Sequence, residues 1–262
     1  MGETRFDGRV AAISGGGGGG MGRAFALDLA ARGAKVAVCG RRPEPIEETV
    51  AMIADAGGEA LAVPCDVRDP VQVDAFFDAC TERFGAADLL VNNAAGNFIC
   101  PAIDLSPNGW NAVISIVLNG SFYCSRAFAL RYREAGRERG AIASVIATYA
   151  WTGNAGTAHS AAAKAGVQNL MMTLAVELAP LGIRCNSIAP GPILTPGATE
   201  NLFPTQEIQD AMSARIPARR LGTLDDVVAA TRYLLSDEAG YVTGSTLTLD
   251  GGGWLPGGMF AR

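Results

Sequence analysis

The sequence predicts a doubly wound α/β protein: one parallel sheet of about seven strands with helices on both faces. Short apolar runs alternate with longer segments of helical periodicity along the 262 residues. This alternation is typical of parallel strands joined by crossover helices. A glycine-rich block follows directly on the first apolar run. No repeat, low-complexity tract or linker divides the chain, so one domain is expected over residues 1–262.

The expected elements follow in order. Strands are expected at residues 9–14, 35–39, 60–63, 88–91, 141–146, 183–188 and 245–249, and helices at 21–32, 44–56, 71–84, 108–133, 157–179 and 224–235. Residues 190–223 are dense in Pro and Gly. They are expected to form a loop region that contacts substrate, with Phe203 and Met212 available to line an apolar pocket.

Composition limits the class of function. The 49% hydrophobic and 18% charged residues are typical of a water-soluble globular protein, and the apolar stretches look too short for a membrane span. The net charge of −5 argues against nucleic acid as a partner. Six scattered cysteines and a single histidine leave no pattern of metal ligands. Reduced thiols and an N-terminus without signal-peptide features predict a cytoplasmic protein.

The glycine block predicts a nucleotide site. Residues 14–22, SGGGGGGMG, place Gly16, Gly20 and Gly22 in a GxxxGxG spacing around Met21, between an expected strand and an expected helix. Glycines there allow a tight turn and let the phosphates of a dinucleotide lie against the helix N-terminus. Such a run is also compatible with a flexible turn, but its context favours the dinucleotide site of a Rossmann fold.

Two arginines at the end of the second strand indicate which dinucleotide is bound. NAD sites usually present an acidic residue there for the ribose hydroxyls, whereas this chain has Arg41 and Arg42. Guanidinium groups pair with a 2′-phosphate through charge-assisted hydrogen bonds, so NADPH is expected. The alternative is that the two arginines are simply exposed before a helix.

Residues after the third and fourth strands are expected to line the adenine–ribose side of this site. Asp66 follows the third strand, beside Val67, and its carboxylate is placed to accept from the adenine amino group. Asn93, Ala94 and Ala95 follow the fourth strand and offer small side chains and amides.

With these pieces in order, the chain resembles the short-chain dehydrogenase/reductase superfamily. The matching features are the glycine block, Asp66, NNAAG at 92–96, Asn119, Lys164, PGPI at 190–193 and DGGGW at 250–254. The resemblance covers nearly the whole chain. It implies a nicotinamide cofactor contacted by Lys164 and by the loop carrying Pro190, Gly191, Ile193 and Thr195, and it implies a homo-oligomer, commonly a tetramer.

The chain departs from the superfamily at its usual proton-handling groups. The YxxxK tyrosine position holds Ser160, and the serine position thirteen residues earlier holds Ala147. Reduction of a plain ketone needs a phenol-type acid beside the carbonyl. The substitution therefore argues against that reaction.

The same displacement is known in 2,4-dienoyl-CoA reductases, which this chain resembles more narrowly. The shared segments are NNAAGNF (92–98), LSPNGW (105–110), IVLNG (116–120), TYAWTG (148–153) and a serine four residues before the lysine. This resemblance implies NADPH-dependent reduction of a dienoyl-CoA thioester, an auxiliary step of unsaturated fatty acid β-oxidation. Asn97 and Tyr149 would then hold the thioester oxygen.

The residues themselves are compatible with these roles. Ser160 and Lys164 are four apart and share one helix face, and Tyr149 lies just past a strand end, where doubly wound folds bind ligands. The alternatives are a half-buried lid residue for Tyr149 and simple turn chemistry for Asn97. Asn119 is expected to satisfy backbone groups or hold a water near Lys164.

Three further expectations remain open. The single histidine, His159, is expected at a pocket wall and is not assigned as a base, because adjacency to Ser160 in a helix does not create a catalytic dyad. Another reductase of the same fold, acting on an enoyl or keto substrate, is the runner-up function. The third possibility is a nucleotide-binding protein without catalysis.

Overall fold

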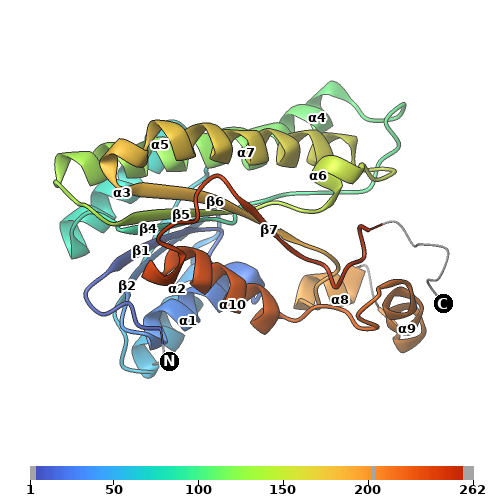
Figure 1. Ribbon diagram of the computed structural model, residues 1–262, viewed down its shortest axis with the longest axis horizontal. Helices are drawn as coiled ribbons and strands as arrows, with labels where there is room; N and C mark the ends of the chain where they lie inside the picture. The colour runs from blue at the N-terminus through green and yellow to red at the C-terminus, as the bar shows by residue number, and fades with distance from the viewer. Residues whose placement is uncertain (1–3, 202–203, 256–262) are drawn as a thin grey trace.

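The computed structural model describes residues 4–201 and 204–255, which form a seven-stranded parallel sheet (Figure 1). The strand order is β3-β2-β1-β4-β5-β6-β7. The strands are β1 (Val10–Ser14), β2 (Lys35–Gly40), β3 (Ala60–Pro64), β4 (Leu89–Asn92), β5 (Gly140–Val145), β6 (Ile183–Pro190) and β7 (Thr246–Leu249). The order reverses beside β1, and this switch point is where doubly wound sheets place their ligand crevice. The predicted fold class is confirmed.

Helices cover both faces of the sheet (Figure 1). One face carries α3 (Pro70–Phe84), α4 (Pro107–Ile114), α5 (Gly120–Glu134) and α7 (Ala158–Glu177); the other carries α1 (Met21–Ala31), α2 (Pro43–Asp55) and α10 (Leu224–Leu235). Short elements α6 (Tyr149–Thr152), α8 (Pro196–Asn201) and α9 (Gln206–Arg215) gather at the end of the sheet where the strands finish.

Local sequence explains where several helices begin. Asp69 precedes Pro70 and accepts from the Val71 amide at 2.9 Å, which satisfies one of the free amides of the first turn of α3. Thr223 and Asp226 form a reciprocal capping box at the start of α10. Capping of this kind sets the point at which each crossover helix leaves the sheet.

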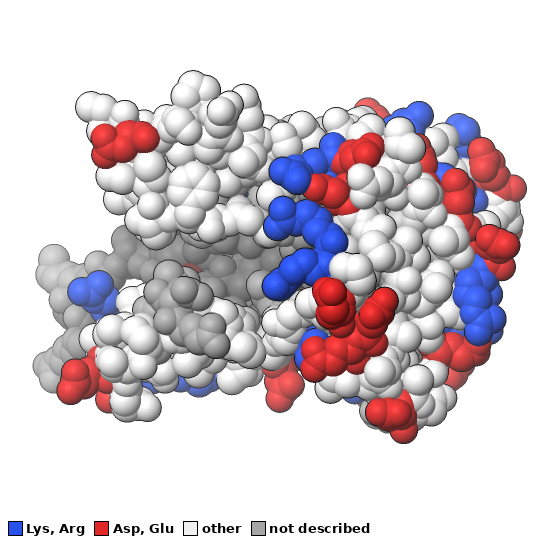
Figure 2. All heavy atoms as spheres, turned by 180° about the vertical axis from the view of Figure 1, so that it is seen from behind, with Lys and Arg blue, Asp and Glu red and all other residues white. Residues whose placement is uncertain are grey.

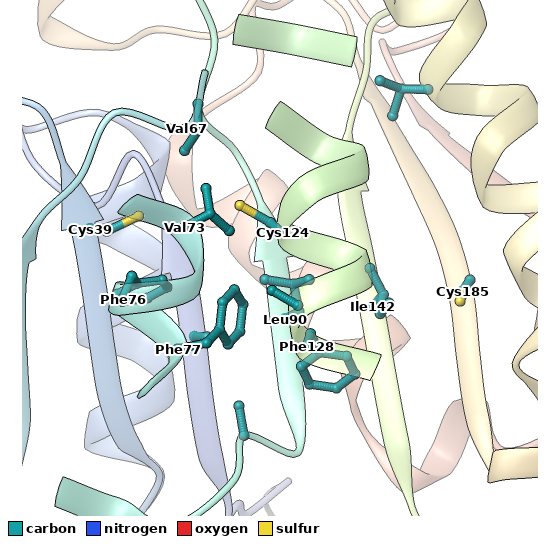
Figure 3. Packing of buried hydrophobic residues seen from close by; sticks show 14 of the residues in the cluster. Cys39, Val67, Val73, Phe76, Phe77, Leu90, Cys124, Phe128, Ile142 and Cys185 are labelled. Carbon is teal, nitrogen blue, oxygen red and sulfur yellow. The ribbon is translucent and has the colours of Figure 1, made fainter. Parts of the chain in front are cut away.

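Two hydrophobic cores lie on opposite faces of the sheet. Between the sheet and α3, α5 and α7, apolar side chains meet from both layers (Figure 3). Those labelled in the figure from the helices are Val73, Phe76, Phe77, Cys124 and Phe128, and they pack on Leu90 and Ile142 of the central strands, among others. The strands read as apolar runs because both faces are buried.

The register of the sheet aligns the strand ends that carry the predicted site. Ser14 lies opposite Cys39 on one side and opposite Asn92 on the other, and Asn92 lies opposite Ser144. Residues that follow these positions therefore emerge at one edge. The glycine block, Arg41, NNAAG and Tyr149 all begin there.

Two local expectations are wrong. Residues 190–223 are not all loop, because Pro196 opens α8, and Thr205 caps α9 by accepting from the Ile208 amide at 3.3 Å. Phe203 lies outside the described residues. The expected helix at 108–133 is confirmed as the continuous run of α4 and α5, with a π-helical turn at Ser115–Asn119, designated η1, between them.

The second error concerns the apolar stretches. The helical run Pro107–Glu134 is long enough and apolar enough to cross a membrane by length and composition alone. Gly120 lies within this run, and a Cβ there would lie 2.8 Å from the Val67 side chain, so the helix packs closely on Val67 at this point. Its Val117, Cys124 and Phe128 are buried in the core beside the sheet, which accounts for part of the apolar character.

Candidate active site

The glycine loop is shaped by contacts that exclude side chains. The amides of Gly15 and Gly16 donate to the Cys39 carbonyl at 2.8 and 3.0 Å, which folds the loop back over β2. A Cβ on Gly22 would lie 2.0 Å from the Gly15 oxygen, so only glycine fits. At Gly20 a Cβ would meet no atom within 4 Å.

That open position stands directly before α1. Gly20 is the N-cap residue and has no side chain to satisfy the first amides of the helix, which begins at Met21. Unpaired amides and the helix dipole favour a phosphate at this point. The cradle therefore fits the pyrophosphate of a dinucleotide.

A cavity of about 220 Å³ continues from the glycine loop toward the end of β3. It brings together six predicted residues that are far apart in the sequence. The lining residues are Gly15, Gly40, Arg41, Cys65, Asp66, Val67, Asn93, Ala94, Ala95 and Ile116. Its position and small lining side chains fit an adenine ring and its ribose.

Asp66 has a partner that sequence reasoning missed. The guanidinium of Arg68 forms an ion pair with both carboxylate oxygens of Asp66, and Arg68 Nε lies 2.9 Å from each of them. This hydrogen bonding lowers the pKa of the Asp66 carboxyl, so the group is ionised. Asp66 thus reaches the cavity as a paired carboxylate and not as a free one. The spacing Asp-x-Arg was the available signal.

Ser14 and Asn93 hold the cavity wall in place. The Ser14 hydroxyl accepts from the amides of Asn93 and Ala94, each at 3.1 Å. The Asn93 side-chain amide donates to the carbonyls of Ser14 and Gly15 at 3.2 and 2.9 Å. Asn93 therefore supports the glycine loop with its side chain while its backbone lines the cavity. Ser14, buried at the end of β1, was also missed.

Arg41 and Arg42 stand at the rim. Both are exposed, and Arg42 is the N-cap residue of α2. Neither guanidinium forms an ion pair with the described part of the chain, in contrast to Arg68. Figure 2 shows basic side chains gathered along the edge of a hollow in this face.

After β5, two hydroxyls meet one helical turn from a buried lysine. Tyr149 begins α6, and its hydroxyl lies 3.1 Å from Ser160 Oγ on α7. Lys164, one turn further along α7, donates from Nζ to the Val145 carbonyl at 2.5 Å. Only 6% of Lys164 is exposed, and burial lowers its pKa to about 8.

The local setting of Tyr149 differs from expectation. A strand-end loop was predicted, whereas Tyr149–Thr152 forms a helical turn closed by the bond from the Gly153 amide to the Tyr149 carbonyl at 3.2 Å. Gly153 has a φ of 69° and ends the turn. The turn brings the phenol back over α7.

The two predicted asparagines occupy different places. Asn97 is exposed in the segment after β4, which is joined to the loop before α7 by the bond from the Cys100 amide to the Gly156 carbonyl at 2.9 Å. Its amide makes no hydrogen bond to the described residues and is available to a ligand. Asn119 ends the π-helical turn, which packs against α7. Such turns are frequent at functional sites.

The segment after β6 contacts β7 and reaches the glycine loop. The Gly191 amide donates to Leu249 of β7 at 2.9 Å, and buried Ile193 pairs with Gly222. Further on, Pro196 lies 3.6 Å from the position a Cβ would take on Gly19. Pro190 ends β6 and Thr195 precedes α8. The predicted cofactor loop therefore lies beside the glycine loop.

A glycine cradle at a helix N-terminus, an adenine-sized cavity and a buried lysine beside two hydroxyls define an oxidoreductase that uses a nicotinamide dinucleotide. A family profile described as Enoyl-(Acyl carrier protein) reductase matches residues 16–253. The chain belongs to the short-chain dehydrogenase/reductase superfamily and, within it, to the 2,4-dienoyl-CoA reductase subgroup.

Two relatives support the subgroup, and one solved structure supports the superfamily. A probable 2,4-dienoyl-CoA reductase of Bacillus subtilis is 47% identical over 94% of this chain and 97% of the relative. The peroxisomal 2,4-dienoyl-CoA reductase SPS19 of Saccharomyces cerevisiae is 38% identical over 98% and 88%. The crystal structure of a gluconate 5-dehydrogenase from Burkholderia cenocepacia in complex with NADP and tartrate superposes with a TM-score of 0.88 at 32% identity, covering 95% of this chain and 96% of that one.

Proposed function

We propose that this enzyme uses NADPH to reduce 2,4-dienoyl-CoA thioesters. The observation that carries the proposal is the contact between the Tyr149 hydroxyl and Ser160 Oγ at 3.1 Å. It returns a phenol to the place from which the superfamily's usual tyrosine is missing. Two relatives named as dienoyl-CoA reductases support the same substrate class.

The choice of NADPH rests on charge at the rim of the cavity. β2 ends at Gly40 without an acidic residue, and Arg41 lines the cavity directly. Because Arg68 is paired with Asp66, Arg41 and Arg42 are the cations available to a 2′-phosphate there. A relative in structure was solved with NADP.

The arrangement suits charge that develops on a thioester oxygen. Bound NADPH would supply the hydride, which would add to the far carbon of the conjugated system. Tyr149 and Asn97 would donate hydrogen bonds to the thioester oxygen as it gains enolate character. Fixed donors of this kind lower the barrier because they need no reorganisation during reaction. Tyr149, or a water held beside it, would then protonate the intermediate.

Lys164 contributes position and charge. Its ammonium is anchored on the Val145 carbonyl and lies one helical turn from Ser160. It would hydrogen-bond the nicotinamide ribose and favour ionisation of a neighbouring hydroxyl. Asn119 would hold a water near this ammonium.

The test is a comparison of substrates with NADPH as reductant. Purified enzyme should oxidise NADPH with a 2,4-dienoyl-CoA and show little activity with ketones or simple sugars. Preference for a ketone would move the assignment to another reductase of the superfamily. Tight NADPH binding without turnover on any acyl-CoA would instead identify a silent member.

We further propose a cytoplasmic homotetramer that acts in unsaturated fatty acid β-oxidation. Large apolar side chains exposed on α5 and α7 support self-association: Phe122 is 43% exposed, Met172 44% and Val176 76%. Sedimentation velocity of the purified protein tests the oligomeric state.

A further inference from the structure

The single histidine lies between the two halves of the proposed oxygen-binding site. His159 is the second residue of α7 and is fully buried. Its ring contacts Phe98, the residue after Asn97, with ring centroids 4.4 Å apart and planes at 79°. On its other side it contacts the amide of Ser160, the residue that holds Tyr149.

The contact to Ser160 solves a problem at the start of α7. The first amides of a helix have no partner within the helix, and the N-cap residue Thr157 supplies no side-chain acceptor. Its hydroxyl donates to the Asn154 carbonyl at 2.9 Å. His159 Nδ1 takes the capping role and accepts from the Ser160 amide at 2.7 Å. The backbone that carries Ser160 Oγ is thereby held in place.

This contact also defines the form of the imidazole. A ring nitrogen that accepts a hydrogen bond carries no proton, so the neutral ring has its proton on Nε2. Nε2 is buried and has no hydrogen-bond partner among the described residues. The imidazole also contacts the ring of Phe98. The two rings meet edge to face, so an N–H or C–H edge of one meets the aromatic face of the other.

The segment that carries Asn97 also packs against the start of α7. Besides the contact of Phe98 with His159, the Cys100 amide donates to the Gly156 carbonyl at 2.9 Å. A Cβ on Gly156 would lie 2.9 Å from Ile99. The segment after β4 thus rests on the residues that open α7, and the imidazole is the aromatic support beneath it.

We propose that His159, as the neutral imidazole protonated on Nε2, is a positioning residue that couples the two oxygen-binding donors. Nδ1 fixes Ser160, and through it the Tyr149 hydroxyl. The edge-to-face contact of the ring fixes Phe98, and through it Asn97. The proposal rests on the function proposed above for the roles of Tyr149 and Asn97, whereas the state of the imidazole itself does not.

Two variants separate the two contacts. His159→Phe keeps an aromatic ring against Phe98 but removes the acceptor, and kcat should fall about tenfold with KM for the thioester little changed. His159→Asn keeps an acceptor near the Nδ1 position but removes the ring that supports Phe98 and Asn97. Because Asn97 is also a donor to the developing charge, kcat should again fall about tenfold with KM for the thioester little changed. NADPH affinity should be unchanged in both. Equal losses in kcat, KM and NADPH affinity would show a general structural role and overturn the proposal.

Because the chain contains one histidine, tag-free protein labelled with ¹⁵N gives one imidazole spectrum. The expected spectrum has a protonated Nε2 and a bare Nδ1, and the ring protons should shift when Phe98→Leu removes the aromatic neighbour. A proton on Nδ1, or no response to Phe98→Leu, would overturn the proposal. If the wild-type enzyme did not turn over dienoyl-CoA, only the proposed substrate would be contradicted. The spectrum tests the state and contacts of His159 without any substrate.

Discussion

Replacing Tyr149 with phenylalanine removes the hydroxyl that lies 3.1 Å from Ser160 Oγ and leaves the aromatic ring at position 149 in place. If that hydroxyl donates to the thioester oxygen as charge develops, its loss should cost on the order of 3 kcal/mol of transition-state stabilisation, or about 10²-fold in kcat. Ground-state contacts change little, so KM for the thioester should stay near the wild-type value.

The structure predicts that the loss is confined to chemistry. The adenine cavity is lined by residues that follow β1 to β4, and Tyr149 is not among them. NADPH affinity should therefore be unchanged. Single-turnover stopped-flow with dienoyl-CoA isolates the hydride-transfer step, and fluorescence titration measures NADPH binding in parallel.

Two companion variants sharpen the result. Tyr241 is fully exposed, and Tyr241→Phe removes a hydroxyl that should have no effect. Ser160→Ala removes the partner of the phenol but not the phenol, so hydride transfer should fall only about tenfold. Hydride transfer at the wild-type rate in Tyr149→Phe would refute the assignment of this phenol. A fall in NADPH affinity as large as the fall in rate would refute its confinement to the chemical step.

Three other predictions concern the cofactor. Removing both rim cations in Arg41→Ala/Arg42→Ala should weaken NADPH binding about 10²-fold, since hydrogen bonds to a charged group are each worth roughly 1.5–3 kcal/mol. NADH binding should be almost unchanged. Equal weakening for both dinucleotides would contradict a 2′-phosphate site. Gly20→Ala should fold normally and bind NADPH poorly, because its Cβ meets no protein atom within 4 Å but enters the phosphate cradle, whereas Gly22→Ala should lose thermal stability because its Cβ lies 2.0 Å from the Gly15 oxygen; thermal melts with and without NADPH distinguish the two. Burial lowers the pKa of Lys164 to about 8, so its ammonium is present below that pH and is lost above it. NADPH affinity should therefore fall as pH rises through about 8. The variant Lys164→Met should show weak NADPH binding without that pH dependence.

Controls for the cofactor variants lie elsewhere on the surface. Arg133 is exposed near the end of α5 and does not line the cavity. Arg133→Ala removes one positive charge, as each rim substitution does. If Arg133→Ala weakened NADPH binding as much as one rim substitution, long-range charge and not direct contact would explain the effect.

Much of the fold was predictable because it is encoded locally. Strand runs such as Val10–Ser14 are apolar on both faces, as expected for a sheet covered by helices on both sides. The glycine at position 22 reports a close backbone contact through its residue type alone. The spacing of Ser160 and Lys164 places both on one helix face before any coordinates are known. The aligned ends of parallel strands then bring the glycine loop, Asp66 and Asn93 to one edge.

The finer parts of the site depended on tertiary structure because they join residues whose separation in sequence says nothing about distance. Sequence placed Tyr149 near a strand end, but only the folding of α6 over α7 brings its hydroxyl to Ser160. The contact of His159 with Phe98 joins residues 61 positions apart in the sequence, and the composition does not specify the path of the chain between them. Burial, and with it the lowered pKa of Lys164, likewise arises only when α7 packs on the sheet, because desolvation is a property of the assembled core.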